Sequence, residues 1–179
     1  MPEDNSELVF AFPVVVRDDA ARLASALPKP DLFAHTFQVT VGGELVRIPR
    51  RIYHDVARID FASCSTAQIE LLDCLLTRHH NGYVREENLR KILRSNHPWV
   101  PPFVVQLVGE YVIEILAAIR DGLGNLDPDL YRAFLRSNSQ FFRLTKQRVV
   151  SYRACYYPQW EKSKYPGFEV LNFFDTLIH

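Results

Sequence analysis

Apolar residues recur at helical spacing through most of the chain after residue 65. The stretch "STAQIELLDCLLTRH" begins with Ser65 and Gln68 at the spacing of a capping box, and its leucines at positions 71, 72, 75 and 76 form a wide apolar stripe. The stretch "VREENLRKILRS" has acids in its first turn and bases in its last, an order that the helix dipole favours. The two patterns predict a pair of helices over 66–79 and 84–95.

The longest apolar stretch, "PWVPPFVVQLVGEYVIEILAAI", marks the expected centre of the fold. Its two adjacent prolines suit the first turn of a helix. The stretch approaches the length of a membrane span, but it carries Gln106, Glu110 and Glu114, and carboxylates are costly at the centre of a bilayer. The pattern therefore predicts one helix over 102–120, buried in the core of a soluble domain.

The stretch "HTFQVTVGGELVRIPRRIY" has the alternating pattern of a β-hairpin over 36–53. Gly42 and Gly43 are the expected turn, because tight hairpin turns need positive φ. In the resulting register Val41 opposes Glu44, Val39 opposes Val46, Phe37 opposes Ile48, and Gln38 pairs with Arg47 on the other face. A lone hairpin is marginal in water, so we expect its apolar face to cap one side of the helices.

The remaining segments have weaker patterns. Residues 7–16 are β-like, but Pro13 cannot donate to a ladder, so an edge strand or an extended arm is expected. Asp18 or Asp19 can cap a short helix that follows. Two helices are expected in "PDLYRAFLRSN" and "SNSQFFRLTKQRVVSYRACYYPQW", and the tail 161–179 is open between strand and loop.

These elements predict one α+β domain over 1–179 that is mainly α, with about five helices around 102–120 and the hairpin near the N-terminus. Within it we expect frayed residues (1–6), a hairpin-containing part (7–64), a helical core (65–160) and a packed tail (161–179).

Composition narrows the function classes. Apolar residues make up 47% and aromatics 12%, enough to order a core. The formal net charge is zero, so no overall field directs the chain to nucleic acid or membrane. Three cysteines without close pairing argue against a disulfide framework and favour a reducing, cytoplasmic location. The acidic start "MPEDNSELVF" lacks the basic region of a secretory signal.

Two adjacent histidines, His79 and His80, raise the question of a metal site. As a calcium loop the stretch lacks carboxylates at its first and last positions. On a helix, adjacent side chains point about 100° apart, so the two imidazoles would not share one ion. The chain has no CxxC and no HxxxH spacing. We therefore assign no metal and no cofactor, and interpret Asn81–Gly82 as the bend between two helices.

A polar line on the apolar stretch is the first candidate site. Gln106, Glu110 and Glu114 recur every four residues. One interpretation makes them a polar pocket with acid–base potential, together with His80 or His97. The other makes them a stripe that faces solvent, or partners for arginines on neighbouring helices, since buried carboxylates are normally paired.

A basic segment over 132–164 is the second candidate site. It holds eight bases and one acid, a local net charge of +7, with tyrosines, phenylalanines and a tryptophan between them. Bases contact phosphates and aromatics stack on unpaired bases. The candidate anion or nucleic-acid face consists of Arg136, Arg143, Lys146, Arg148, Arg153, Lys162 and Lys164. The same pattern also fits a solvated helix surface over buried aromatics.

No catalytic motif is present: the chain has no GxSxG, no GxxxxGK and no GxGxxG. We assign no catalytic residue and expect a non-catalytic, cytosolic protein-interaction module that self-associates as a homo-oligomer. One alternative is a nucleic-acid-associated protein that uses 132–164. Another is an enzyme or small-ligand binder with Glu110 and Glu114 in a pocket. No membrane association is expected.

Overall fold

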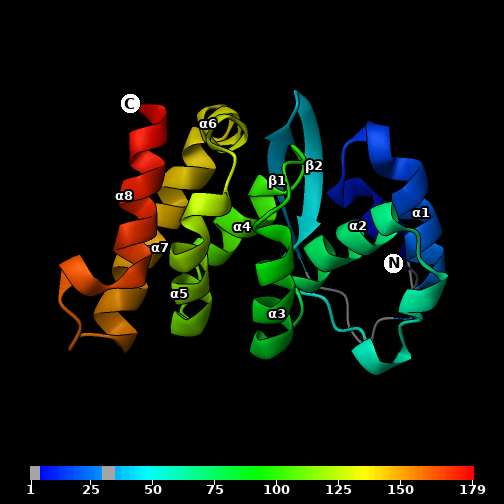
Figure 1. Ribbon diagram of the computed structural model, residues 1–179, viewed down its shortest axis with the longest axis horizontal. Helices are drawn as coiled ribbons and strands as arrows, with labels where there is room; N and C mark the ends of the chain where they lie inside the picture. Colours follow the sequence, from blue (N-terminus) through cyan, green and yellow to red (C-terminus); the bar gives the residue numbers. More distant parts are fainter. Residues whose placement is uncertain (1–4, 30–34) are drawn as a thin grey trace.

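Helices make up most of the fold, and one hairpin lies among them (Figure 1). The computed structural model describes residues 5–29 and 35–179. Its α-helices are α1 (Arg17–Ala26), α2 (Thr66–Leu76), α3 (Gly82–Ile92), α4 (Pro101–Val108), α5 (Ile113–Gly122), α6 (Pro128–Ser137), α7 (Ser139–Tyr156) and α8 (Pro166–Ile178), and its strands are β1 (Thr36–Val41) and β2 (Glu44–Pro49). The predicted class, α+β and mainly α, is confirmed. No helix in the described ranges has both the length and the hydropathy to cross a membrane.

The hairpin lies inside the molecule rather than at its edge. In Figure 1, α5 to α8 gather on one side of α4, and the hairpin stands between α4 and the N-terminal helices. Strand β2 contacts the 3-10 segment η1 (Asn5–Ala11), and β1 contacts α6. The expectation that the hairpin caps one side is wrong, because the N-terminal segment supplies a second apolar layer that covers it.

The hairpin register is confirmed pair by pair, from Val41 opposite Glu44 to Thr36 opposite Pro49. The turn glycines have φ of 57° and 86°, the left-handed region in which glycine is unstrained. The apolar face is buried, as the alternation predicted.

The predicted pair of helices is confirmed as α2 and α3. The capping box is present, since Gln68 N donates to Ser65 Oγ at 3.2 Å and Ser65 N donates to Gln68 Oε1 at 2.9 Å. Helix α3 begins at Gly82, and the side chain of Asn81 caps it by accepting from Tyr83 N. Asn81–Gly82 is therefore the start of the second helix as well as the bend.

The single helix expected over 102–120 is wrong. Helix α4 ends at Val108, α5 begins at Ile113, and Gly109 closes α4 with φ −82° and ψ 22°. A Cβ at Gly109 would lie 3.3 Å from Arg148 Cδ, so glycine gives α7 a close approach at this break. Directly after this turn, the carboxylate of Glu110 contacts three arginines. The helical spacing of apolar residues does not indicate such a contact.

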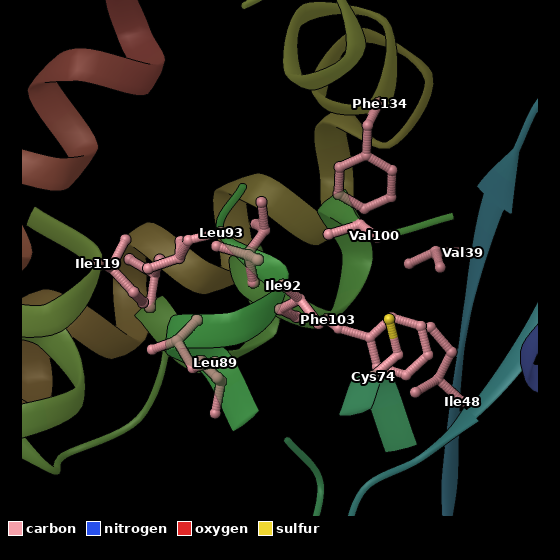
Figure 2. Packing of buried hydrophobic residues seen from close by; sticks show 14 of the residues in the cluster. Val39, Ile48, Cys74, Leu89, Ile92, Leu93, Val100, Phe103, Ile119 and Phe134 are labelled. Atoms are coloured by element: carbon pink, nitrogen blue, oxygen red, sulfur yellow. The ribbon is translucent and has the colours of Figure 1, made fainter. Parts of the chain in front are cut away.

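Helix α4 is nevertheless the centre of the core, with every residue from Pro101 to Val108 buried. Figure 2 shows Phe103 among side chains that include Cys74, Leu89 and Ile92. The Phe103 ring also stacks on Phe12, with 5.6 Å between centroids, so it joins the N-terminal layer to α4.

The N-terminal expectations need correction. Residues 7–16 form 3-10 turns, η1 and η2 (Val14–Val16), rather than a strand or an extended arm. A short apolar run fits strand and helix equally, and the tertiary contacts of the buried Phe12 decide between them. Helix α1 begins at Arg17, so Asp18 and Asp19 lie in its first turn and do not cap it.

The C-terminal tail and the first described residue, Asn5, are more ordered by contacts than the sequence pattern suggests. The tail is helix α8, whose Val170 and Phe174 are fully buried. The prediction of strand or loop is wrong because Pro166 opens a helix there. Fraying was expected over residues 1–6; residues 1–4 lie outside the described residues, but Asn5 is buried and donates to Leu27 O at 3.1 Å.

Candidate functional site

Glu110, one residue beyond Gly109, lies at the centre of three arginines. Its Oε1 accepts from Arg51 at 2.8 Å and from Arg78 at 3.0 Å, and its Oε2 lies 3.1 Å from Arg85 Nε. The carboxylate is buried, and so are the guanidinium groups of Arg78 and Arg85. A carboxylate among three arginines leaves an excess of positive charge in the interior.

Two of these arginines also hold the main chain around the site. Arg78 donates to Pro49 O at 3.3 Å, to Thr77 O at 3.2 Å and to Arg50 O at 2.8 Å. Arg85 donates to the carbonyls of His79 and His80 at 2.9 and 2.8 Å. The cluster thus ties the end of β2, the turn after α2 and the break between α4 and α5 to one another.

The charges determine the protonation state of the cluster. Burial alone raises the pKa of the Glu110 carboxyl, but the charges of Arg78, Arg51 and Arg85 together outweigh it and hold that pKa below its usual range. Burial lowers the pKa of Arg78 to about 10, against the opposing charge of Glu110. At neutral pH Glu110 is therefore a carboxylate beside charged Arg78, so it has no proton to donate and is a poor base.

An open pocket of about 290 Å³ adjoins this cluster. Its lining consists of Arg50, Arg51, Gln106, Gly109, Glu110, Tyr111, Arg148 and Tyr152. Neither Arg50 nor Arg148 has a carboxylate within 4.0 Å in the described part of the chain. Partial burial, followed by the charge of Arg148, lowers the pKa of Arg50. We call this site the arginine pocket; five guanidinium groups lie in or beside it, against the one carboxylate of Glu110.

Gln106 adds an unsatisfied polar atom to the arginine pocket. Its side chain is 6% exposed, and its Oε1 accepts no hydrogen bond from any described residue. A buried amide without a partner costs free energy, which a donor from a bound ligand would recover. Gln106 also lines a second, larger space beside the pocket, so it stands at the boundary of the two.

Tyr111 and Tyr152 line the arginine pocket, and Tyr156 packs on both of them to complete a tyrosine rim. The rings of Tyr111 and Tyr156 stack with 5.2 Å between centroids, and Tyr152 lies 5.9 Å from each. Tyr111 is 49% exposed and Tyr156 is 56% exposed. The rim therefore places exposed aromatic side chains next to Arg148.

The polar line proposed from the sequence is only partly brought together. Gln106 and Glu110 line the arginine pocket, but Glu114, His80 and His97 do not. Glu114 is exposed in the first turn of α5. His97 Nε2 lies 3.1 Å from Glu70 Oε2 instead. The sequence left open whether Glu110 belongs to an acid–base pocket or pairs with arginines, and the observed contacts are those of pairing with arginines.

The basic face proposed from the sequence is spread over several environments. Lys146 pairs with Asp175 and Lys164 with Glu161. The guanidinium groups of Arg136 and Arg153 donate to carbonyls, those of Ile178 and Trp160. Arg143 and Lys162 are exposed on the surface, and Arg148 alone among the seven lies in the arginine pocket.

His79 and His80 lie after the end of α2, so the helical angle does not separate their rings. Their centroids are 4.3 Å apart. His79 Nδ1 accepts from Asn81 N at 3.1 Å, and its Nε2 lies 2.9 Å from His54 O, an arrangement that suits the neutral ring with its proton on Nε2. Within the described ranges, histidines, cysteines and acids form no group of three or more that fits a metal ion.

Protonation of His79 is expected to destabilise the fold. Burial is the main reason that the pKa of His79 is lowered. The unfolded chain therefore takes up a proton below about pH 6.5 while the folded chain resists it, and stability is lost as pH falls through that window. The fall in unfolding free energy between pH 7 and pH 5 should be smaller in His79→Gln than in the wild type, measured by urea denaturation at each pH. Equal falls would show that His79 is not involved.

The sequence did not indicate four arginines of the site, Arg50, Arg51, Arg78 and Arg85. They come from the end of the hairpin, the turn after α2 and the first part of α3. Arginine is normally exposed, so the sequence gives no sign that one of them is completely buried. The pair "RR" after the hairpin was the only local signal.

Comparisons of the chain with protein-family models, with curated proteins and with solved structures give no match.

Proposed function

We propose that this chain is a non-catalytic protein-interaction module that binds an anionic group of its partner in the arginine pocket. The observation that carries the proposal is the pair Arg50 and Arg148, which face the pocket without a carboxylate among the described residues. Two like charges held together cost free energy, and a bound anion would recover it. The odd number of cysteines supports a cytoplasmic location for such a module.

The state of Glu110 supports binding rather than catalysis. A general acid or base needs a pKa near the working pH, whereas the three arginines keep the pKa of Glu110 low. The carboxylate instead holds Arg51 beside the pocket, in a fixed orientation. A preorganised guanidinium gives up less entropy on binding an anion than a mobile one does.

Titration calorimetry with citrate and with inorganic pyrophosphate tests the proposal. Both anions should bind the wild-type chain at low salt, and binding should weaken as sodium chloride is added. Arg148→Gln should weaken binding by about tenfold or more, because a charge-assisted hydrogen bond contributes roughly 1.5–3 kcal/mol.

The matched control is Arg143→Gln, which removes the same charge from the same helix but at an exposed position outside the pocket. It should bind both anions nearly as the wild type does. If neither anion binds, or if the two variants lose affinity equally, the arginine pocket is not the site.

Nucleic-acid binding is a second candidate, which the tyrosine rim favours. Exposed rings beside Arg148 are the arrangement on which unpaired bases stack. Of the basic face, however, Lys146 and Lys164 are paired with acids, which weakens phosphate contacts. Binding of single-stranded oligonucleotides in the same titrations, with loss in Tyr111→Ala, would favour this function over protein interaction. Self-association through the same site would require an acidic segment of a second copy.

A further inference from the structure

The outer edge of β1 presents some main-chain groups that have no partner among the described residues. Arg50 N donates to His35 O, so these two residues form a hydrogen-bonded pair of the hairpin. Together with the register of β1 and β2, this pair shows which residues of β1 direct their main-chain groups toward β2. In an antiparallel pair, N–H and C=O groups point alternately to the partner strand and away from it. Thr36, Gln38 and Thr40 therefore point away from β2. Strand β2, on the other side of the hairpin, contacts η1.

Within the described part of the chain, Thr40 alone among these three residues has its outward groups satisfied. Thr40 N donates to Asn138 Oδ1 at 2.7 Å, and Asn138 Nδ2 donates to Thr40 O at 2.8 Å. The asparagine amide thus pairs with the strand edge as the main chain of another strand would. The main chain of Gln38 forms no corresponding bond within the described ranges, so the edge is open beyond Asn138. An open edge is a template for a further strand.

A groove of about 570 Å³ runs along this open edge. Its lining includes Gln38 and Thr40 of β1 and, on α7, Gln140, Leu144 and Arg148. These three residues of α7 are four apart and share one face of the helix. The rings of Phe37 and Phe141, stacked with 5.5 Å between centroids, also line the groove.

The two ends of the groove differ in chemistry. Asn138 closes one end, and Arg50, Gln106 and Arg148 form the other, where the groove meets the arginine pocket. From Gln140 to Arg148 the helix rises about 12 Å, which matches about four extended residues. A segment of that length, lying along β1, would place a carboxylate at its end between the two unpaired arginines.

We propose that this groove binds an extended, acidic segment of a partner protein, which adds as a strand to the open edge of β1 and places its carboxylates in the arginine pocket. The inference rests on the proposed function, because it names the partner of the same pocket. Main-chain hydrogen bonds to Gln38 and Thr36 supply affinity, as in other strand additions, and the arginines select acidic segments.

Gln38→Pro tests the strand addition directly. Proline removes the N–H of residue 38, which points away from β2, so the β1–β2 ladder keeps its hydrogen bonds. Gln38→Thr is the matched control, since it changes the side chain and keeps the N–H. The probes are two labelled hexapeptides of alternating threonine and valine, one with two glutamates at its carboxyl end and one with them at its amino end. Fluorescence anisotropy measures their binding.

At least one peptide should bind the wild type, and its affinity should fall by about tenfold or more in Gln38→Pro but little in Gln38→Thr. Lysine in place of the glutamates should abolish binding. N-methylation of alternate peptide amides should abolish binding in one register and have little effect in the other, because only one set of amides faces β1. This last measurement decides the question even if Gln38→Pro does not fold.

Two results would overturn the inference. The first is that neither peptide binds at millimolar concentration. The second is that the peptides methylated on either set of alternate amides both bind as the unmodified peptide does. If citrate still binds in an Arg148-dependent way, the arginine pocket remains and only the strand addition fails. If citrate and the peptides both fail to bind, both the strand addition and the proposed function are wrong.

Discussion

Glu110→Gln is expected to lower the free energy of unfolding by about 3–5 kcal/mol, the usual cost of removing one partner of a buried ion pair. Glutamine keeps the shape of the side chain and one acceptor oxygen, but it removes the charge and replaces the other oxygen by an amide nitrogen, which cannot accept from an arginine. Arg78 and Arg85, both buried, would then remain beside Arg51 without the counterion they share. Urea denaturation measures the effect; guanidinium chloride is unsuitable because it is a salt and screens the arginines.

Glu114→Gln is the matched control for this change. It replaces the same side chain four residues later, where Glu114 is exposed at the start of α5. The control should stay within about 0.5 kcal/mol of the wild type. Citrate should also stabilise Glu110→Gln more than the wild type, since an added anion takes over part of the missing charge. A loss below about 1 kcal/mol would mean that water solvates the arginines and that the cluster does not hold the site.

Arg78→Met is expected to lower the free energy of unfolding by about 3 kcal/mol or more. Methionine fills part of the space, but it leaves the carbonyl oxygens of Pro49 and Thr77 without their side-chain donor, while Arg50 O keeps the hydrogen bond from Arg51 Nη1. Glu110 keeps two of its three arginines, so the loss comes mainly from the unsatisfied carbonyls. The measurement is again urea denaturation at low salt.

Two further variants separate charge from geometry at this position. Arg78→Lys keeps the charge but replaces the planar guanidinium by a single ammonium. The ammonium does not reach all four acceptors of Arg78, which are three carbonyl oxygens and Glu110. Arg78→Lys should therefore recover less than half of the unfolding free energy that Arg78→Met loses. Arg94→Met makes the same change as Arg78→Met at an exposed residue and should be nearly neutral. If Arg78→Lys were as stable as the wild type, the charge alone would matter and the hydrogen bonds to the carbonyls would not.

These stability effects bear on binding because the cluster builds the arginine pocket. Glu110 orients Arg51, and Arg78 fixes the carbonyl of Arg50 at the end of β2. Loss of either contact frees a residue of the pocket wall. Variants at Arg148 are better probes of binding, since Arg148 makes no ion pair with a described residue and its removal breaks no buried contact of the cluster.

Local patterns in the sequence determined the hairpin and the helical pair. The register follows from the turn glycines and from period-two alternation, so it was predicted in full. The capping box at Ser65 is a contact between neighbours in sequence, and it too was predicted correctly. The apolar stretch around Phe103 identified the core, because so many apolar side chains are removed from water only by packing together in the interior.

The tertiary structure alone decided the break after Val108 and the arginine pocket. Glu110, which directly follows the break, pairs with arginines 25 to 59 positions away in sequence, beyond the reach of any local pattern. Periodicity reports which residues are apolar, not which distant charge compensates a buried one. For this protein, local spacing therefore determined the elements and the hairpin pairing. The tertiary structure decided which distant charges meet, because it brings Glu110 together with Arg51, Arg78 and Arg85 beside the arginine pocket.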